Sequence, residues 1–312
     1  MDNNYHEIQE LLHQKADLYA RLKLLPYDGT PEVKTNLDKK YLYIRKRVAG
    51  KLTSEYIDVY NEDLYAFLLK NAQQAKELKK QIRKIEKQLA FMGYSDNELS
   101  NRVMLNIQFA RINMKTSIYD QAVLEGIDTT FPQTEDIVEN GLIYGVAAQD
   151  VQKILNLKHA WEFIMDPDVL SYPSDYSLLS HIAGLVNEGF YQYGGRIRGV
   201  PVTIGTFYIP PLPIEAQVKE QLNALVQANK EPVDIAISLC LYCMKTQIFN
   251  DGNKRSAVLF ANHYLISKGS GLLVIPNQSV SEFKQLLIRY YEDKDNGEIY
   301  DFLRNKAWRK FD

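Results

Sequence analysis

Apolar residues recur at intervals of three and four along most of the chain, the spacing that brings side chains onto one face of a helix. This periodicity predicts helices over residues 101–126, 134–140, 148–165, 174–192, 214–229, 233–248, 253–268, 279–293 and 297–309. A glycine- and proline-bounded alternation within "GGRIRGVPVTIGTFYIPPLP" predicts one small hairpin rather than a larger sheet. The pattern therefore predicts a mainly α protein, a helical bundle with small β excursions.

Residues 1–95 follow a different pattern and are richer in charge. Their second helix carries a heptad repeat with one polar member, formed by Leu64, Leu68, Asn71, Ala75, Leu78, Ile82, Ile85 and Leu89. Before it, "KKYLYIRKRVAGKLTSEYIDVY" alternates as a β-hairpin does, and an earlier apolar pattern predicts a first helix. We expect a helix–β-hairpin–helix interaction region over 1–95. Its helices pair as an intramolecular helical hairpin or, in a homo-oligomer, as a coiled coil between chains.

Composition narrows the function class. The chain is 46% hydrophobic and 24% charged, which suits a folded protein with a sizeable core. The net charge of −2 gives no overall basic field, and the bases of the hairpin have acidic neighbours, so we expect a solvated face there and no nucleic-acid partner. The polar N-terminus and the lack of long apolar runs predict a cytoplasmic protein without a membrane partner. Cys240 and Cys243 lie in an apolar helical run and are interpreted as core residues.

The stretch "TQIFNDGNKRSA", residues 246–257, has the composition of a phosphate-binding turn. Gly252 is free to adopt a positive φ, and the backbone N–H groups from Gly252 to Arg255 would then lie at the positive end of the next helix. Lys254 and Arg255 add positive charge, and Asp251 offers a hard oxygen ligand for Mg²⁺. The alternative is an ordinary turn and helix cap with two exposed bases.

The segment "QIFNDGNKR" resembles the signature of the Fic (filamentation induced by cAMP) family, in which His is followed by any residue or Pro, then Phe, any residue, Asp or Glu, Gly, Asn, Gly or Lys, and Arg. Eight of the nine positions agree, and Gln247 stands where the family has its His. "LLSHIAGLVNEGFYQYGGRIRGVPVTIGTFYIPPLP" and "AVLEGIDTTFPQTEDIVENG" extend the resemblance to roughly residues 100 to 310. Residues 96–312 are therefore interpreted as a Fic domain.

The resemblance implies an α-helical fold in which the motif loop holds the phosphates of a nucleotide together with Mg²⁺. It implies that Phe249 anchors this loop in the core. It implies nucleotide contacts for Gly252, Asn253, Lys254 and Arg255, and a metal-ligand role for Asp251. With Gln247 at the position of the family's His, these residues make up the candidate catalytic and nucleotide-binding site.

The resemblance also implies a reaction and a partner. Typical members transfer AMP from ATP to a hydroxyl of a protein side chain, whereas Lys254 is similar to the death-on-curing branch, which transfers a phosphoryl group. A flap around Ile204, Gly205 and Thr206 would hold the protein target by adding a strand to it.

Three positions depart from the family pattern. Gln247 has no group that titrates near neutral pH, so it cannot act as the general base. Val258 replaces a second Arg that many AMP-transferring members carry. Glu125 and Gly126 match the end of the family's inhibitory segment, but Gln121 stands where that segment has Ser or Thr, and Val258 leaves Glu125 without its usual partner. We expect Glu125 either to meet Arg255 or Lys254, or to be a plain helix-end carboxylate.

Three functions remain open at the level of sequence. The first is an adenylyltransferase or phosphotransferase weakened or altered by the loss of the motif His, since positioning and Mg²⁺ supply much of the rate in such chemistry. The second is an inactive pseudoenzyme that senses a nucleotide. The third is an interaction scaffold whose working part is residues 1–95. The target protein and the transferred group are not encoded in any recognisable pattern.

Overall fold

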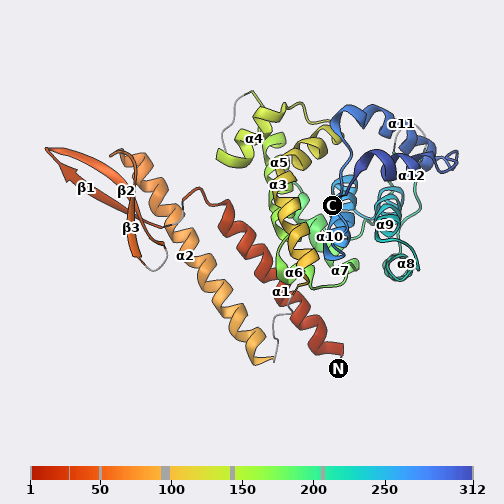
Figure 1. The fold of residues 1–312 in the computed structure, drawn as a ribbon, viewed down its shortest axis with the longest axis horizontal. Coiled ribbons are helices and arrows are strands. Elements are labelled where there is room, and N and C mark those ends of the chain that lie inside the picture. Colours follow the sequence, from red (N-terminus) through yellow and green to blue (C-terminus); the bar gives the residue numbers. More distant parts are fainter. Residues whose placement is uncertain are drawn as a thin grey trace. The chain divides into compact units, whose positions relative to one another are not determined.

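The computed structural model describes residues 2–27, 29–48, 51–92, 99–140, 145–204 and 208–310. It is mainly helical with short antiparallel strands, which confirms the predicted fold class (Figure 1). The chain divides into two compact units, Met1–Ser95 and Asp96–Asp312. Within the described ranges, none of the helices is both long enough and apolar enough to cross a membrane.

The first unit holds two helices and one sheet: α1 (Asp2–Leu24), β1 (Thr30–Asn36), β2 (Lys39–Val48), β3 (Lys51–Val59) and α2 (Glu62–Phe91). The strands run antiparallel in the order β1-β2-β3, with Thr30 opposite Arg45 and Val48 opposite Lys51. The sequence predicted only the β2–β3 pair. Strand β1 was missed because "TPEVKTN" is an exposed edge with a single large apolar residue, Val33, and so lacks an alternating pattern.

One face of this sheet packs on the start of α2, where Leu42 and Ile44 meet Leu68. The buried residues of α2 belong to the predicted heptad repeat: Leu68, Asn71, Ala75, Ile82, Ile85 and Leu89. Helix α1 packs along α2. The polar member of the repeat has a specific partner, because the Asn71 amide donates to the backbone carbonyl of Tyr27. A buried amide is tolerated when it is hydrogen-bonded in this way.

The second unit is a bundle of helices: α3 (Asn101–Leu124), α4 (Phe131–Asn140), α5 (Ala148–Ile164), α6 (Pro167–Leu170), α7 (Tyr176–Val186), α8 (Glu215–Val226), α9 (Pro232–Thr246), α10 (Asn253–Ser267), α11 (Val280–Tyr291) and α12 (Glu298–Phe302). Helix α10 is central and contacts α3, α5, α7 and α9 (Figure 1). Its residues from Asn253 to Ile266 are buried with one exception, Lys254. A helix that is buried on all sides forms a rigid base for whatever lies at its N-terminus.

The last segment corrects a prediction. Instead of one helix over 297–309, α12 ends at Phe302, a turn of π-helix covers Leu303–Ala307, and β5 (Trp308–Arg309) pairs with β4 (Leu272–Leu273). Two contacts draw this segment out of helical form: the indole of Trp308 donates to the Ser270 carbonyl at 2.8 Å, and Arg309 pairs with Asp120 at 2.6 Å. Tertiary contacts therefore override local propensity here.

Helix α3 is held by residues from the far end of the unit. The Arg102 guanidinium donates to the Gly269 carbonyl at 2.8 Å, and the Asn106 side chain accepts from the Gly271 N–H at 2.6 Å. These bonds, together with the Asp120–Arg309 pair, fix the direction in which α3 runs. They thereby set where its last residues, next to Glu125, come to lie.

Candidate functional site

The site begins where α9 ends. Gln247 follows Thr246 with φ of 49°, in the left-handed region, and this reverses the chain into the turn. Phe249 is 1% exposed and its backbone pairs with Ile197, so its side chain lies in the core as the resemblance implied. The turn is therefore attached to a buried residue at its start and to the buried helix α10 at its end.

Helix α10 begins directly after Gly252, whose φ is +72°. Across the described part of the chain, the backbone N–H groups of residues 252 to 255 have no acceptor, and the first bond of the helix runs from Ser256 N to Gly252 O at 2.8 Å. Unpaired N–H groups at a helix N-terminus carry a positive partial charge. The turn therefore offers a row of unpaired N–H groups at the start of α10, and anion binding there stays a prediction.

The side chain of Asn253 is committed to the loop itself. Its carbonyl oxygen accepts from the N–H of Phe249 at 2.9 Å, and its amide donates to the Phe249 carbonyl at 2.8 Å and to the Gln247 side chain at 3.1 Å. Asn253 therefore has only its backbone N–H left for an anion. Its side chain keeps the turn in shape.

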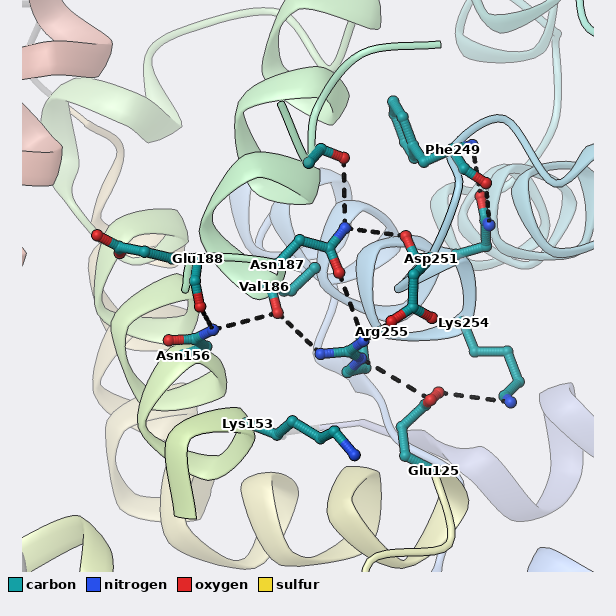
Figure 2. A network of polar contacts seen from close by, with 12 residues as sticks. Glu125, Lys153, Asn156, Val186, Asn187, Glu188, Phe249, Asp251, Lys254 and Arg255 are labelled. Atoms are coloured by element: carbon teal, nitrogen blue, oxygen red, sulfur yellow. Dashed lines mark hydrogen bonds and ion pairs between the residues drawn. The ribbon is translucent and has the colours of Figure 1, made fainter. Parts of the chain in front are cut away.

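Arg255 is buried, with 3% of its surface exposed, and its guanidinium is largely satisfied. One terminal nitrogen donates to the Val186 carbonyl at 2.8 Å, and the other lies 3.2 Å from the Asp251 carboxylate (Figure 2). The Nε atom is buried and makes no hydrogen bond among the described residues. An unpartnered donor on a buried cation is costly unless a ligand completes it.

Glu125 faces this donor. Its carboxylate oxygens lie 3.8 Å from Arg255 Nε and 3.6 Å from Lys254 Nζ, distances that allow ion pairing but not direct hydrogen bonding (Figure 2). Of the alternatives left open by the sequence, the structure shows Glu125 near both cations while it also caps the C-terminus of α3. Gly126 follows with φ of +81° and turns the chain away. A carboxylate thus lies beside the two cations that the resemblance assigns to phosphate.

The sequence did not reveal the role of Asn187. It is fully buried, and its amide donates to the Asp251 carbonyl at 2.9 Å, while its carbonyl oxygen lies 3.5 Å from Arg255. Asn187 caps α7, which ends at Val186, whereas the periodicity predicted a helix to residue 192. The pattern of apolar residues cannot predict this role, because the Asn187 side chain bonds to the motif loop, 64 positions further along the chain.

Two further polar residues frame the site. Asn156 donates to the Val186 and Glu188 carbonyls at 3.3 and 2.8 Å and so supports the segment that holds Arg255. Lys153, on the same helix α5, extends toward Arg255 and Glu125 (Figure 2). The Lys153 ammonium pairs with Asp150 at 3.1 Å. About a third of the Lys153 side chain is exposed.

Arg198 connects the flap segment to the motif loop. It is 2% exposed, and its guanidinium donates only to backbone carbonyls, those of Gln247, Val200, Pro210 and Pro211, at 2.5, 2.9, 3.2 and 2.5 Å. Beyond Arg198, Ile204 pairs with Tyr208 in both directions. Of the predicted flap residues, Gly205 and Thr206 lie outside the described part of the chain. The bonds of Arg198 fix both ends of the flap relative to Gln247.

The Gln247 side chain is itself in use. Its amide donates to the Met244 carbonyl at 2.7 Å, its oxygen accepts from Asn253, and the Tyr291 phenol lies near it. Burial above all raises the pKa of Tyr291 well above its usual range, and the nearby Cys240 and Glu125 add to the effect. The phenol therefore stays protonated near neutral pH. Neither of the side chains next to that of Gln247, Asn253 and Tyr291, can therefore act as a base at that pH.

The remaining histidines and cysteines of this region are structural. His263 is fully buried between Ser174 and the Val169 carbonyl, at 2.8 and 3.0 Å, and burial lowers its pKa to about 4. Burial raises the pKa of Cys240 to about 12, and both cysteines are buried and free, as the sequence predicted. The described residues contain no group of three or more His, Cys, Asp or Glu side chains arranged to hold a metal ion.

We expect Gly252→Ala to lower the free energy of unfolding by about 2–4 kcal/mol, from a left-handed alanine plus the repacking of its neighbours. An added Cβ would lie 2.8 Å from Asn187 Oδ1 and 3.0 Å from Val186 Cγ2. The matched control is Gly145→Ala, which has the same φ of +72° but a nearest neighbour at 3.5 Å, and should cost about 1 kcal/mol. Urea unfolding measures the free energy of unfolding of both variants. Equal losses would show that Asn187 can move aside for the added Cβ without a cost in stability.

Comparisons with known proteins point to the Fic/DOC family. Residues 173–265 match the sequence model of the Fic/DOC family, and residues 5–66 match that of a domain of unknown function, DUF6788. A protein adenylyltransferase Fic of Drosophila willistoni is 26% identical over 197 residues, which is 60% of this chain. The match covers 38% of that relative's length.

Solved structures share the fold at low identity. A Fic-domain-containing signalling protein from Bacteroides thetaiotaomicron has a TM-score of 0.55 and 20% identity, over 70% of this chain and 89% of that one. Fic-1 from C. elegans has a TM-score of 0.50 and 18% identity, over 78% of each chain. A Fic family protein from Desulfovibrio desulfuricans has a TM-score of 0.51 and 15% identity, over 67% and 73%.

Proposed function

Because the chain contains a domain of the Fic/DOC family, we propose that it binds ATP with Mg²⁺ at the N-terminus of α10 and transfers AMP, or a phosphoryl group, slowly to a protein hydroxyl. The observation that carries this proposal is the set of unpaired backbone N–H groups from Gly252 to Arg255, next to two cations. Unpaired N–H groups at a helix N-terminus can bind phosphate oxygens without help from other side chains.

The contacts of Glu125 support the same assignment. A carboxylate and a phosphate are both anions with oxygen acceptors, so Glu125 occupies the position that suits a phosphate oxygen. Lys254 offers an ammonium that is about one third exposed, and Arg255 offers its unpartnered Nε. A bound phosphate would satisfy both donors at shorter distance. Glu125 therefore opposes nucleotide binding in this arrangement.

Asp251 fits the role of metal ligand. Its carboxylate is about half exposed, and only one of its oxygens contacts Arg255. Mg²⁺ is usually held by one or two carboxylates together with phosphates and water, so no larger protein cluster is needed. When bound with ATP, the ion would neutralise phosphate charge and favour in-line attack by the hydroxyl.

Transfer would join the target's hydroxyl oxygen to the α-phosphorus with release of pyrophosphate, or to the γ-phosphorus with release of ADP. In both cases the hydroxyl proton must leave, and Gln247 cannot accept it. The turn, Lys254 and Arg255 would hold and polarise the phosphates. The flap that Arg198 supports would align the target backbone by strand addition at Ile204.

A second function is nucleotide sensing without transfer. The contacts of Gln247 favour it, because its side-chain amide already bonds to Met244 and Asn253 within the protein. A side chain with these partners is engaged in holding the loop rather than in orienting a substrate. Binding would be the same in both functions, and they differ only in the covalent step.

Calorimetric titration of Mg·ATP tests the shared part of the proposal. We expect measurable binding to the unaltered chain, about tenfold tighter binding to Glu125→Gln, and about tenfold weaker binding to Lys254→Ala, since charge-assisted hydrogen bonds are worth roughly 1.5–3 kcal/mol. Lys268→Ala, at the opposite end of α10, is the matched control and should leave affinity unchanged. Equal affinities in the two lysine variants, or no binding in any protein, would refute binding at this turn.

A further inference from the structure

The two units of the chain have opposite charge. Residues 1–95 hold 17 Lys and Arg against 13 Asp and Glu, whereas residues 96–312 hold 20 against 26. The net charge of the whole chain, −2, is therefore the sum of a basic first unit and an acidic second unit. A basic domain within an acidic protein can attract a polyanion although the whole chain does not.

Six of the 17 basic residues of the first unit line one groove. A hollow of about 1350 Å³ runs along α2 beside the start of β1 at Thr30 and Pro31. Its basic lining residues are Lys76, Lys79, Lys80, Arg83, Lys84 and Lys87. Among the described residues that line it, Glu77 alone is acidic. These six basic side chains are exposed and outnumber the one acidic residue of the groove, Glu77.

The spacing of these cations suits a linear polyanion. Lys76, Lys80, Arg83 and Lys87 follow one another in steps of four, three and four, so they form a row on one face of the helix. At 1.5 Å per residue the row is about 16 Å long. A nucleic-acid backbone, with a phosphate every few ångströms, can follow it.

The other face of the sheet offers aromatic rings. Tyr43 and Tyr56 lie opposite each other with ring centroids 5.6 Å apart, and Tyr41 lies 6.3 Å from Tyr56. Lys34, on the same strand β1 that borders the groove, places its ammonium 4.5 Å from the Tyr43 ring centre. Tyr56 is half exposed. Tyr41 and Tyr43 are partly buried, and Lys34 also pairs with Glu32 at 3.7 Å. An exposed ring with a cation nearby is a usual platform for an unstacked base.

We propose that the first unit binds single-stranded nucleic acid, with the phosphates along the α2 groove and bases on the tyrosines of the sheet. Neither observation alone selects this ligand, since a row of lysines attracts any polyanion. The tyrosines add a preference for bases, and β1 joins the two surfaces. This function is separate from nucleotide binding at α10 and does not depend on it. It differs from the expectation, based on overall charge, that no nucleic acid is bound.

Fluorescence anisotropy of a labelled short oligo(dT) with the full chain tests the proposal. We expect Lys80→Glu/Lys87→Glu to weaken binding at least about tenfold, and to flatten the dependence of log K on log salt by about 0.7 for each lost phosphate contact. The matched control is Lys230→Glu/Lys284→Glu, which makes the same change in charge at exposed sites of the second unit. Equal loss of affinity in the two variants, or no binding at low salt, would refute the binding of nucleic acid in the α2 groove.

Tyr56→Ala distinguishes nucleic acid from other polyanions. We expect this variant to bind oligo(dT) about tenfold more weakly, because base stacking contributes roughly 1–3 kcal/mol per base, and to bind inorganic polyphosphate unchanged. An unchanged affinity for oligo(dT), or stronger binding to vesicles of anionic phospholipid than to oligo(dT), would overturn the assignment to nucleic acid. Circular dichroism of each variant verifies that the unit stays folded.

Discussion

Gln247→His is expected to raise the rate of transfer from ATP by about two to four powers of ten, the usual contribution of a general base. The position accepts the change, because its φ of 49° lies in the left-handed region where histidine is enriched among non-glycine residues. The imidazole would stand at the start of the anion-binding turn, where an attacking hydroxyl loses its proton. A rate that rises with pH through the titration of the new histidine is expected in the variant and not in the unaltered chain.

The measurement follows label from α- and γ-labelled ATP into the chain and into added extract proteins, which also separates AMP transfer from phosphoryl transfer. Gln247→Ala is the control, since it removes the hydrogen bonds to Met244 and Asn253 without adding a base. Transfer that increases equally in both variants would mean that release of the loop, and not proton abstraction, limits the rate. No transfer by the histidine variant, with ATP binding intact, would favour nucleotide sensing.

Arg198→Ala is expected to lower the free energy of unfolding of residues 96–312 by about 3–5 kcal/mol, because several hydrogen bonds to a charged group, worth about 1.5–3 kcal/mol each, are lost together. The loss leaves four backbone carbonyls without their donor, those of Gln247, Val200, Pro210 and Pro211. Because two of these carbonyls come from the far end of the flap, the variant should also lose order in the flap and the motif loop.

Arg196→Ala is the matched control for this loss. It removes an arginine two residues earlier whose guanidinium lies 3.8 Å from the Tyr193 ring centre, an interaction worth about 0.5–1 kcal/mol at an exposed site. Both tryptophans of the chain, Trp161 and Trp308, belong to the second unit, so urea unfolding followed by their fluorescence reports on that unit alone. Similar costs for the two variants would contradict a structural role for the buried network.

The sequence predicted the parts of the fold that have a strong period. The heptad repeat located α2, and the apolar runs located α9 and α10. It failed where a segment takes its form from distant partners. Strand β1 is an edge with little apolar surface, and β5 leaves the predicted helix because Trp308 and Arg309 find partners near Ser270 and Asp120. Neither event has a local signal.

The candidate site shows the same division. The turn from Gln247 to Arg255 was found because its residues are contiguous and carry their own chemistry. Asn187 and Arg198 were quoted within longer stretches but given no role, since their partners are backbone atoms of segments that lie far away in sequence. Whether Glu125 would meet Lys254, Arg255 or neither depended on how α3 is placed, and that is a property of the whole bundle.

The bonds that hold α3 have a consequence for the order of events during synthesis. Arg102, Asn106 and Asp120 are joined to residues 167, 165 and 189 positions further along the chain. At about 5–20 residues per second, α3 leaves the ribosome on the order of ten seconds or more before Arg309 does. Through that interval the helix lacks these partners, and loop closure over such separations is slow. We therefore expect Glu125 to reach Lys254 and Arg255 late in folding, after the whole turn from Gln247 to Arg255 has left the ribosome.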